Sequence, residues 1–177
     1  MNRFIKEAYE HVGEGTHAEP VMVAENLVYP QKNGWGCGVW AMRHCFMKWG
    51  YNVDPYELAK TAHVGQSGTT DRKFELAAMI MGSKYTMHDQ VTAKRAKQTI
   101  DSLLMRGQPL VLYVANHKHV IACLHHTRKG YLIFDSGAML NQPVIQVHGW
   151  KWLMNEMKFK DLNNQRFFCI GSVSKPR

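Results

Sequence analysis

The sequence contains no long hydrophobic run, no internal repeat and no low-complexity tract. It therefore lacks the stretch of roughly 20 apolar residues that a membrane-spanning helix requires. The segment Met1–Glu7 also lacks the apolar core of a signal peptide and instead has the pattern of a short amphipathic helix. We expect a cytoplasmic protein with no membrane partner. The length suits a single domain, residues 1–177, on which residues 1–30 pack as an N-terminal extension.

Cysteine is scarce, and its spacing excludes the common metal motifs. The four cysteines, Cys37, Cys45, Cys123 and Cys169, form no Cys-x-x-Cys pair. We expect no metal and no cofactor, and all four thiols reduced in a cytosolic compartment. The last three lie in apolar surroundings, which predicts core positions.

Acidic residues are outnumbered, 14 against 22 basic ones, which gives a net charge of +8. Such a charge suits nucleic acid, an acidic protein surface, or simply solubility. The basic residues are dispersed, with the densest group at Lys94–Lys97, and no known nucleic-acid module is present. We do not expect nucleic acid as the main partner, whereas an acidic protein partner stays open.

The chain changes character near residue 110, where helical patterns give way to strand patterns. Near-continuous apolar runs predict strands that are covered on both faces. Helices followed by antiparallel strands indicate the α+β class, in two lobes with a cleft between them. The predicted helices cover 37–49, 54–64, 71–81, 92–107 and 150–157, and the predicted strands cover 21–24, 84–88, 110–114, 119–124, 131–134 and 167–170.

Cys37 is the first candidate for chemistry, because it lies between two glycines at the predicted start of a helix. The N–H groups and dipole of a helix N-terminus favour a thiolate. Gly34, Gly36 and Gly38 allow a tight turn and leave space near the sulfur. Gln31, six residues earlier, carries an amide N–H suited to an oxyanion. The competing interpretation is that Cys37 is a small, inert core residue.

His119 and Asp135 are the candidates for a base and its orienting carboxylate. If strands 119–124 and 131–134 pair through a turn near 128–130, both residues fall at the same end of the hairpin. A carboxylate there would hold the imidazole tautomer and stabilise its charged form. Two alternatives stay open: His117 competes for the role of base, and Asp135 in Asp-Ser-Gly also fits an ordinary turn.

These residues resemble the papain-like cysteine peptidases, most closely the bacteriocin-processing type that removes double-glycine leaders, with its stand-alone relatives. The resemblance covers roughly residues 30–137. It is carried by Gln-x5-Cys-Gly at Gln31–Gly38, Gly68-Thr69 before a helix, Gly107-Gln108-Pro109 before a strand, His119-Val120-Ile121, and Ile133-Phe134-Asp135. It implies a papain-like fold, with the nucleophile helix of an N-terminal helical lobe packed on a C-terminal antiparallel sheet.

The resemblance also implies the role of each residue. Cys37 attacks, His119 acts as base and then as acid, Asp135 orients His119, and Gln31 helps to form the oxyanion hole. The expected activity is hydrolysis of a peptide or isopeptide bond in a protein or peptide substrate that is small or Gly-rich at the cleavage site. Two alternatives stay open: an acyltransferase or deamidase using the same residues, and an inactive binding module for an acidic partner.

The sequence departs from that family in two respects. Ser136 follows Asp135 where the family usually has proline, and no transporter is attached, so we do not expect coupling to leader export. The string Gly34–Gly38 also resembles proteases that act on Ufm-type modifiers. Those enzymes place their histidine two residues after the aspartate, where this chain has Gly137, so the order of residues favours the first family. Neither the substrate nor the oligomeric state follows from the sequence.

Overall fold

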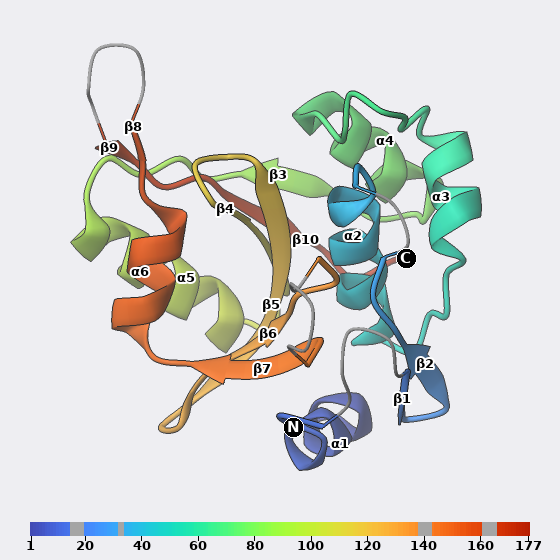
Figure 1. Ribbon diagram of the computed structural model, residues 1–177, viewed down its shortest axis with the longest axis horizontal. Helices are drawn as coiled ribbons and strands as arrows, with labels where there is room; N and C mark the ends of the chain where they lie inside the picture. The colour runs from blue at the N-terminus through green and yellow to red at the C-terminus, as the bar shows by residue number, and fades with distance from the viewer. Residues whose placement is uncertain (15–19, 32–33, 138–142, 161–165) are drawn as a thin grey trace.

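The computed structural model describes residues 1–14, 20–31, 34–137, 143–160 and 166–177. Its centre is an antiparallel six-stranded sheet in the order β3-β10-β4-β5-β6-β7 (Figure 1). These strands are β3 Tyr85–Met87, β4 Leu110–Val114, β5 His119–Thr127, β6 Gly130–Phe134, β7 Ile145–His148 and β10 Ile170–Val173. Two short pairs lie outside the sheet: β1 Val21–Val23 with β2 Asn26–Val28, and β8 Phe159–Lys160 with β9 Arg166–Phe167.

Helices lie on both sides of this sheet (Figure 1). On one side are α2 Cys37–Met47, α3 Pro55–Thr61 and α4 Asp71–Ile80, and on the other are α5 Ala93–Met105 and α6 Trp150–Met157. The helix α1 Arg3–Glu10 lies below the sheet in this view. Among the described residues, no helix combines the length and apolar character needed to cross a bilayer. The α+β class expected from the sequence is confirmed.

Two hydrophobic cores explain why the strands are apolar at nearly every position. In β5, Val120, Ala122 and Leu124 face the core shared with α2, whereas Ile121 and Cys123 face the core beneath α5 and α6. Successive strand residues point to opposite faces, so a sheet covered on both faces needs apolar side chains throughout. The apolar runs therefore indicated double coverage correctly.

Helix α2 is the most deeply buried helix, and every residue from Gly38 to Met47 is buried. A helix that is apolar on all sides must be surrounded by protein. Even Arg43 and His44 are buried, because the sheet, α3 and α4 enclose α2 together. Full burial fixes the start of α2, and with it Cys37, rigidly against the sheet.

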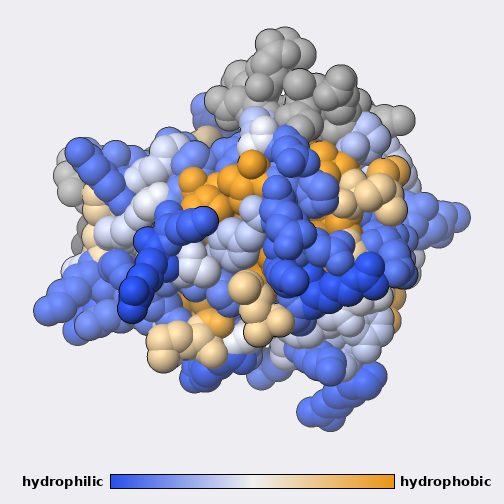
Figure 2. Space-filling model, turned by 90° about the horizontal axis from the view of Figure 1, so that it is seen from below, coloured by the Kyte–Doolittle hydropathy of each residue, from blue (hydrophilic) through white to orange (hydrophobic). Residues whose placement is uncertain are grey.

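The N-terminal segment packs on the same core. Phe4 of α1 stacks on Phe134 with ring centroids 5.7 Å apart. The buried Arg43 of α2 donates hydrogen bonds to the carbonyl oxygens of Leu27 (2.7 Å) and Val53 (3.0 Å), which ties the β1–β2 hairpin to α2. Seen from below, this side of the molecule shows hydrophobic patches between hydrophilic side chains (Figure 2). Residues 15–19 of the expected extension lie outside the described residues.

The sequence missed the shortest strands. It gave no signal for β2, β7, β8 or β9, and its last strand, predicted over 167–170, in fact covers Ile170–Val173. Strands of two to four residues carry little alternation and are easily missed, although β1 and β3, of three residues each, lie within the predicted ranges 21–24 and 84–88. They form because neighbouring strands supply hydrogen-bond partners, as when β7 pairs along β6 from Phe134 to Tyr131.

His44 is a fully buried, titratable residue in the middle of α2. Its ring lies 5.0 Å from that of Phe134, and neither ring nitrogen has a hydrogen-bond partner among the described residues. Burial, together with the nearby charge of Arg43, holds the pKa of His44 well below its usual value. The folded protein therefore keeps this imidazole neutral under conditions in which the unfolded chain protonates it.

We predict that His44 makes folding sensitive to acid. Below about pH 6.5 the unfolded chain binds a proton that the folded state rejects, so the free energy of unfolding falls by up to about 1.4 kcal/mol per pH unit. Urea unfolding between pH 7.5 and pH 5 measures this slope. In His44→Leu the free energy of unfolding should depend less steeply on pH, by the contribution of one proton. The control His63→Asn, at an exposed site, should keep the pH dependence of the wild type. Equal slopes in His44→Leu and wild type would contradict the prediction.

Candidate active site

Cys37 is the first residue of α2 and is partly exposed. The helix begins without a side-chain cap: Gly36 precedes it, and its carbonyl oxygen accepts a hydrogen bond from the N–H of Trp40 at 3.1 Å. The first N–H groups of a helix have no partner within the helix. Cys37 therefore stands at the positive end of a buried helix, as the sequence predicted.

Gly38 allows a loop to approach Cys37. A Cβ atom on Gly38 would lie 2.4 Å from Oγ1 of Thr69 and 2.9 Å from the Phe74 ring, so no larger residue fits. This close approach brings residues 66–69 beside Cys37, where they line the same pocket. The glycine expected to leave space near the sulfur thus has a definite role, which is to make room for Thr69.

His119 and Asp135 meet at one end of the β5–β6 hairpin. Ala122 pairs with Phe134, and extending this register by three positions places His119 across from Gly137. Asp135, two residues earlier, is then a diagonal neighbour of His119. Nε2 of His119 lies 2.6 Å from Oδ1 of Asp135. The structure therefore brings these two predicted residues together.

The His119 ring contacts both Asp135 and Cys37. Burial alone would lower the pKa of His119, but the hydrogen bonds to Asp135 and Cys37 and their charges outweigh it and raise that pKa to about 10. Because Nε2 is engaged by Asp135, Nδ1 is left for the sulfur. An imidazole held between a carboxylate and a thiol is the arrangement that thiol nucleophiles require.

Gly137 completes the support of the imidazole. Its N–H donates a hydrogen bond to Oδ1 of Asp135 at 3.0 Å, so the carboxylate oxygen that binds His119 is held from a second side. A Cβ atom on Gly137 would lie 2.4 Å from Cε1 of His119. The ring therefore packs directly on the glycine backbone, which fixes its position.

Gln31 is attached to the residue that follows Asp135. Its N–H donates to the carbonyl oxygen of Ser136 at 2.9 Å, and its side-chain Oε1 accepts a hydrogen bond from Oγ of Ser136 at 3.0 Å. Ser136 is buried. The segment Asp135–Gly137 thus contacts both the predicted base and the predicted oxyanion residue.

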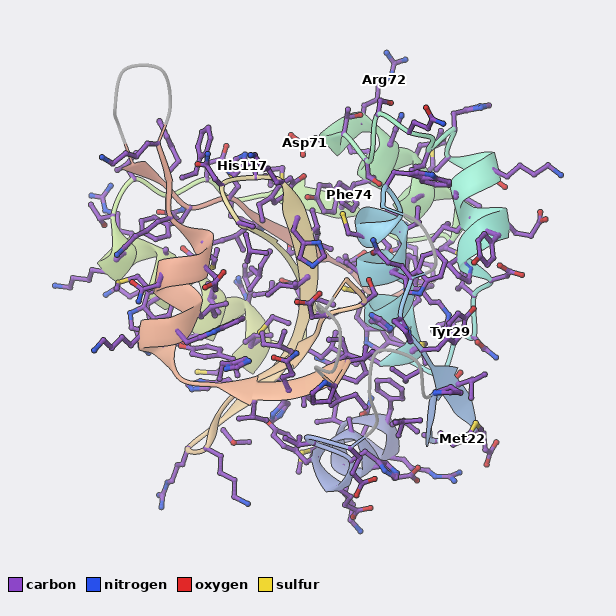
Figure 3. The ribbon with its side chains drawn as sticks, in the orientation of Figure 1. Met22, Tyr29, Asp71, Arg72, Phe74 and His117 are labelled. Atoms are coloured by element: carbon purple, nitrogen blue, oxygen red, sulfur yellow. The ribbon has the colours of Figure 1, made fainter. Side chains whose placement is uncertain are left out.

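His117, the competing candidate for the base, has different surroundings. Its ring stacks on Phe159 with centroids 4.0 Å apart and lies 5.3 Å from the ring of Tyr113. Tyr113 in turn donates a hydrogen bond to Asp71 at 2.5 Å. In Figure 3, His117 lies on the sheet side and Asp71 on the α4 side of the upper part of the molecule. Burial lowers the pKa of His117, against the opposing charges of Asp89 and Asp71, and its buried Nε2 has no hydrogen-bond partner among the described residues.

A pocket of about 250 Å³ opens beside Cys37. It is lined by loop 66–69 and by Tyr113, His117 and Lys118, among others. Among the described residues, no three His, Cys, Asp or Glu side chains gather closely enough to bind a metal ion. The pocket has room for a substrate side chain next to the sulfur.

Sequence reasoning missed three residues that shape this site. The sequence assigned no role in the site to Ser136 or Gly137, which fit a turn after Asp135, and none to Thr69, which precedes a helix. The one available signal was the unusual residue after Asp135. Their contacts with Gln31, His119 and Gly38 join residues from 18 to 105 positions apart in the chain, which no local pattern reveals.

Comparison with known proteins agrees with this geometry. The sequence profile of the Peptidase C39 family matches residues 26–144. No curated protein matches the chain.

Solved structures with a similar fold include three peptidases. The peptidase domain of Streptococcus ComA, a bifunctional ABC transporter involved in quorum sensing, has a TM-score of 0.55 at 14% identity, covering 91% of this chain and 100% of that one. A double-glycine-motif protease from an AMS/PCAT transporter, in complex with its leader peptide, has a TM-score of 0.55 at 15% identity, covering 92% and 97%. A C39-like peptidase from Bacillus anthracis has a TM-score of 0.52 at 13% identity, covering 90% and 100%.

At these identities the structures show a shared papain-like fold, and the family is shown by the sequence profile. The profile spans more than half of the chain and includes Cys37, His119 and Asp135. The chain therefore belongs to the Peptidase C39 family and is a cysteine peptidase, a hydrolase.

Proposed function

We propose that the protein hydrolyses a peptide or isopeptide bond through a Cys37–His119–Asp135 triad, with Gln31 in the oxyanion hole. The observation that carries the proposal is the His119 ring, hydrogen-bonded to Cys37 on one side and to Asp135, at 2.6 Å, on the other. Because the pKa of His119 is about 10, its imidazolium persists at neutral pH and can balance a thiolate on Cys37.

The proposed acylation step begins when the Cys37 thiolate attacks the substrate carbonyl carbon. The charge that develops on the carbonyl oxygen is stabilised by the main-chain N–H of Cys37 and the side-chain amide of Gln31, each worth about 3 kcal/mol. His119 gives its proton to the nitrogen of the leaving amine, and the C–N bond breaks. A thioester on Cys37 remains.

Deacylation reverses the role of His119. The neutral imidazole takes a proton from a water molecule, which attacks the thioester carbonyl. The same two N–H donors stabilise the second oxyanion, and collapse releases the acid product and the Cys37 thiolate. Asp135 keeps the ring oriented in both steps and stabilises its charged form.

We further propose a peptide substrate with small residues at the cleavage site. One relative of similar fold is described as a double-glycine-motif protease in complex with a leader peptide, and the pocket beside Cys37 is about 250 Å³. We also propose a reducing, cytosolic compartment, because a catalytic thiol must stay unoxidised and all four cysteines are free.

The first test is labelling of the nucleophile. Iodoacetamide near pH 6 should modify Cys37 first, because its sulfur is partly exposed beside the His119 ring, whereas Cys45 and Cys123 are buried and burial raises the pKa of Cys169. Peptide mass mapping after proteolysis identifies the labelled thiol. Cys37→Ala and His119→Ala should abolish selective labelling, whereas the control Cys169→Ala should not. Equally slow modification of all four cysteines would reject the proposed triad.

The second readout distinguishes hydrolysis from the alternative activities. Fluorogenic peptides ending in Gly-Gly should be cleaved faster than matched peptides ending in Phe-Gly, and Cys37→Ala should be inactive. Product mass separates the reactions, since deamidation adds about one dalton without cleavage and transfer adds an acceptor. Salt-sensitive binding of an acidic protein by both wild type and Cys37→Ala, with no turnover by either, would favour the binding-module alternative.

The pKa of His119 gives a prediction about pH. Its pKa is raised in the folded state to about 10, so the stabilisation it provides is complete below about pH 6.5 and is lost as the pH rises through about 10. Titration of the ring by ¹⁵N NMR should show this value. In Asp135→Asn the ring should titrate at lower pH, because the carboxylate charge is gone, while the His117 ring should titrate as before. An unchanged His119 titration would contradict the role of Asp135.

The packing of His119 on Gly137 gives a further prediction. Gly137→Ala should displace the ring from Cys37, because the new methyl group would occupy its position. A displacement of about 1 Å lowers turnover roughly 100-fold. The rate at saturating fluorogenic peptide measures the effect, and Gly149→Ala, where a Cβ meets nothing within 4 Å, is the control. Full activity of Gly137→Ala would show that this contact does not position the ring.

A further inference from the structure

Ser136 stands where it can act on the oxyanion residue rather than on the base. Its side chain is 2% exposed, and its Oγ donates a hydrogen bond to Oε1 of Gln31 at 3.0 Å. Its carbonyl oxygen also accepts the main-chain N–H of Gln31 at 2.9 Å. Gln31 is therefore held at two points by one residue, once through its backbone and once through the oxygen of its carboxamide.

We propose that Ser136 is a positioning residue that holds the Gln31 carboxamide in place before substrate binds. This inference rests on the proposed oxyanion role of Gln31. With Oε1 directed at Ser136, the N–H₂ end of the same planar group is turned away from Ser136. Only that end stabilises an oxyanion, since a carbonyl oxygen in its place would repel the developing negative charge.

The effect of Ser136 follows from preorganisation. A donor stabilises a transition state best when it needs no rearrangement during the reaction. Without the hydroxyl, the Gln31 side chain would lose one fixed contact and sample further rotamers. Its backbone would stay in place, because the hydrogen bond to the Ser136 carbonyl oxygen does not depend on the side chain.

The position of Ser136 in the chain also connects the two halves of the site. It lies between Asp135, which binds His119, and Gly137, which binds the Asp135 carboxylate through its N–H. One tripeptide therefore sets the distance between the base and the oxyanion donor. A proline at position 136, usual in sequences that this chain resembles, would have no hydroxyl to make the contact.

Acylation by 4-nitrophenyl acetate tests the proposal, because this small ester requires no peptide recognition. The burst of 4-nitrophenolate reports acylation of Cys37, with Cys37→Ala as the blank. Ser136→Ala should lower the acylation rate constant about tenfold with little change in the apparent KM. Ser136→Thr, which keeps the hydroxyl, should retain most of the rate. The control Ser172→Ala removes a similarly buried hydroxyl, bonded to His88 at 2.9 Å, and should leave acylation unchanged.

A double-mutant cycle shows whether Ser136 acts through Gln31. Gln31→Ala should slow acylation by roughly 10²–10³-fold, and Gln31→Ala/Ser136→Ala should be no slower than Gln31→Ala alone. Iodoacetamide alkylation of Cys37, which forms no oxyanion, should proceed equally fast in Ser136→Ala and wild type.

Three results would overturn the inference. Additive losses in the double variant, or slower alkylation in Ser136→Ala, would mean that Ser136 supports the fold or the Cys37–His119 pair instead. If Gln31→Ala were active and Cys37→Ala inactive, the proposed peptidase activity would be supported. The oxyanion role of Gln31, on which the role of Ser136 depends, would be rejected. No acylation or selective alkylation of Cys37 in wild type would instead reject the proposed function itself.

Discussion

The site depends on one imidazole held between two partners that come from different parts of the fold. Cys37 belongs to α2, and Asp135 follows β6, so the His119 ring meets both only if helix and hairpin are fixed relative to each other. Burial of α2 against β5 provides that fixation, because Val39, Trp40 and Met42 are wholly enclosed in the core that the sheet shares. The position of the Cys37 thiol beside His119 therefore depends on the packing of α2 against the sheet.

The segment Asp135–Gly137 is where the two halves of the site join. Its carboxylate binds His119, its serine binds Gln31 through backbone and side chain, and its glycine supports the imidazole ring. Gln31 leads towards α2, so these bonds also connect the stretch before the nucleophile to the end of β6. Few residues therefore control the relative positions of nucleophile, base and proposed oxyanion donor.

The pocket beside Cys37 is formed in a different way. Its loop, residues 66–69, can lie close to α2 because Gly38 has no side chain. Gly38 leaves room for Thr69, and residues 66–69 line the same pocket as Tyr113 and Lys118. Membership of the Peptidase C39 family explains the fold and the class of reaction. The residues of this pocket are those available to contact a substrate beside Cys37.

The sequence by itself determined the larger elements, the α+β class and the residues suited to the chemistry, because helix caps, apolar runs and the spacing of Gln31, Cys37, His119 and Asp135 are local signals. It could not determine β2, β7 or the role of Ser136, because these depend on partners far away in the chain. Only the tertiary structure decided which histidine faces the sulfur. His117 and His119 are two residues apart and equally plausible locally, but packing directs the first onto Phe159 and the second between Cys37 and Asp135.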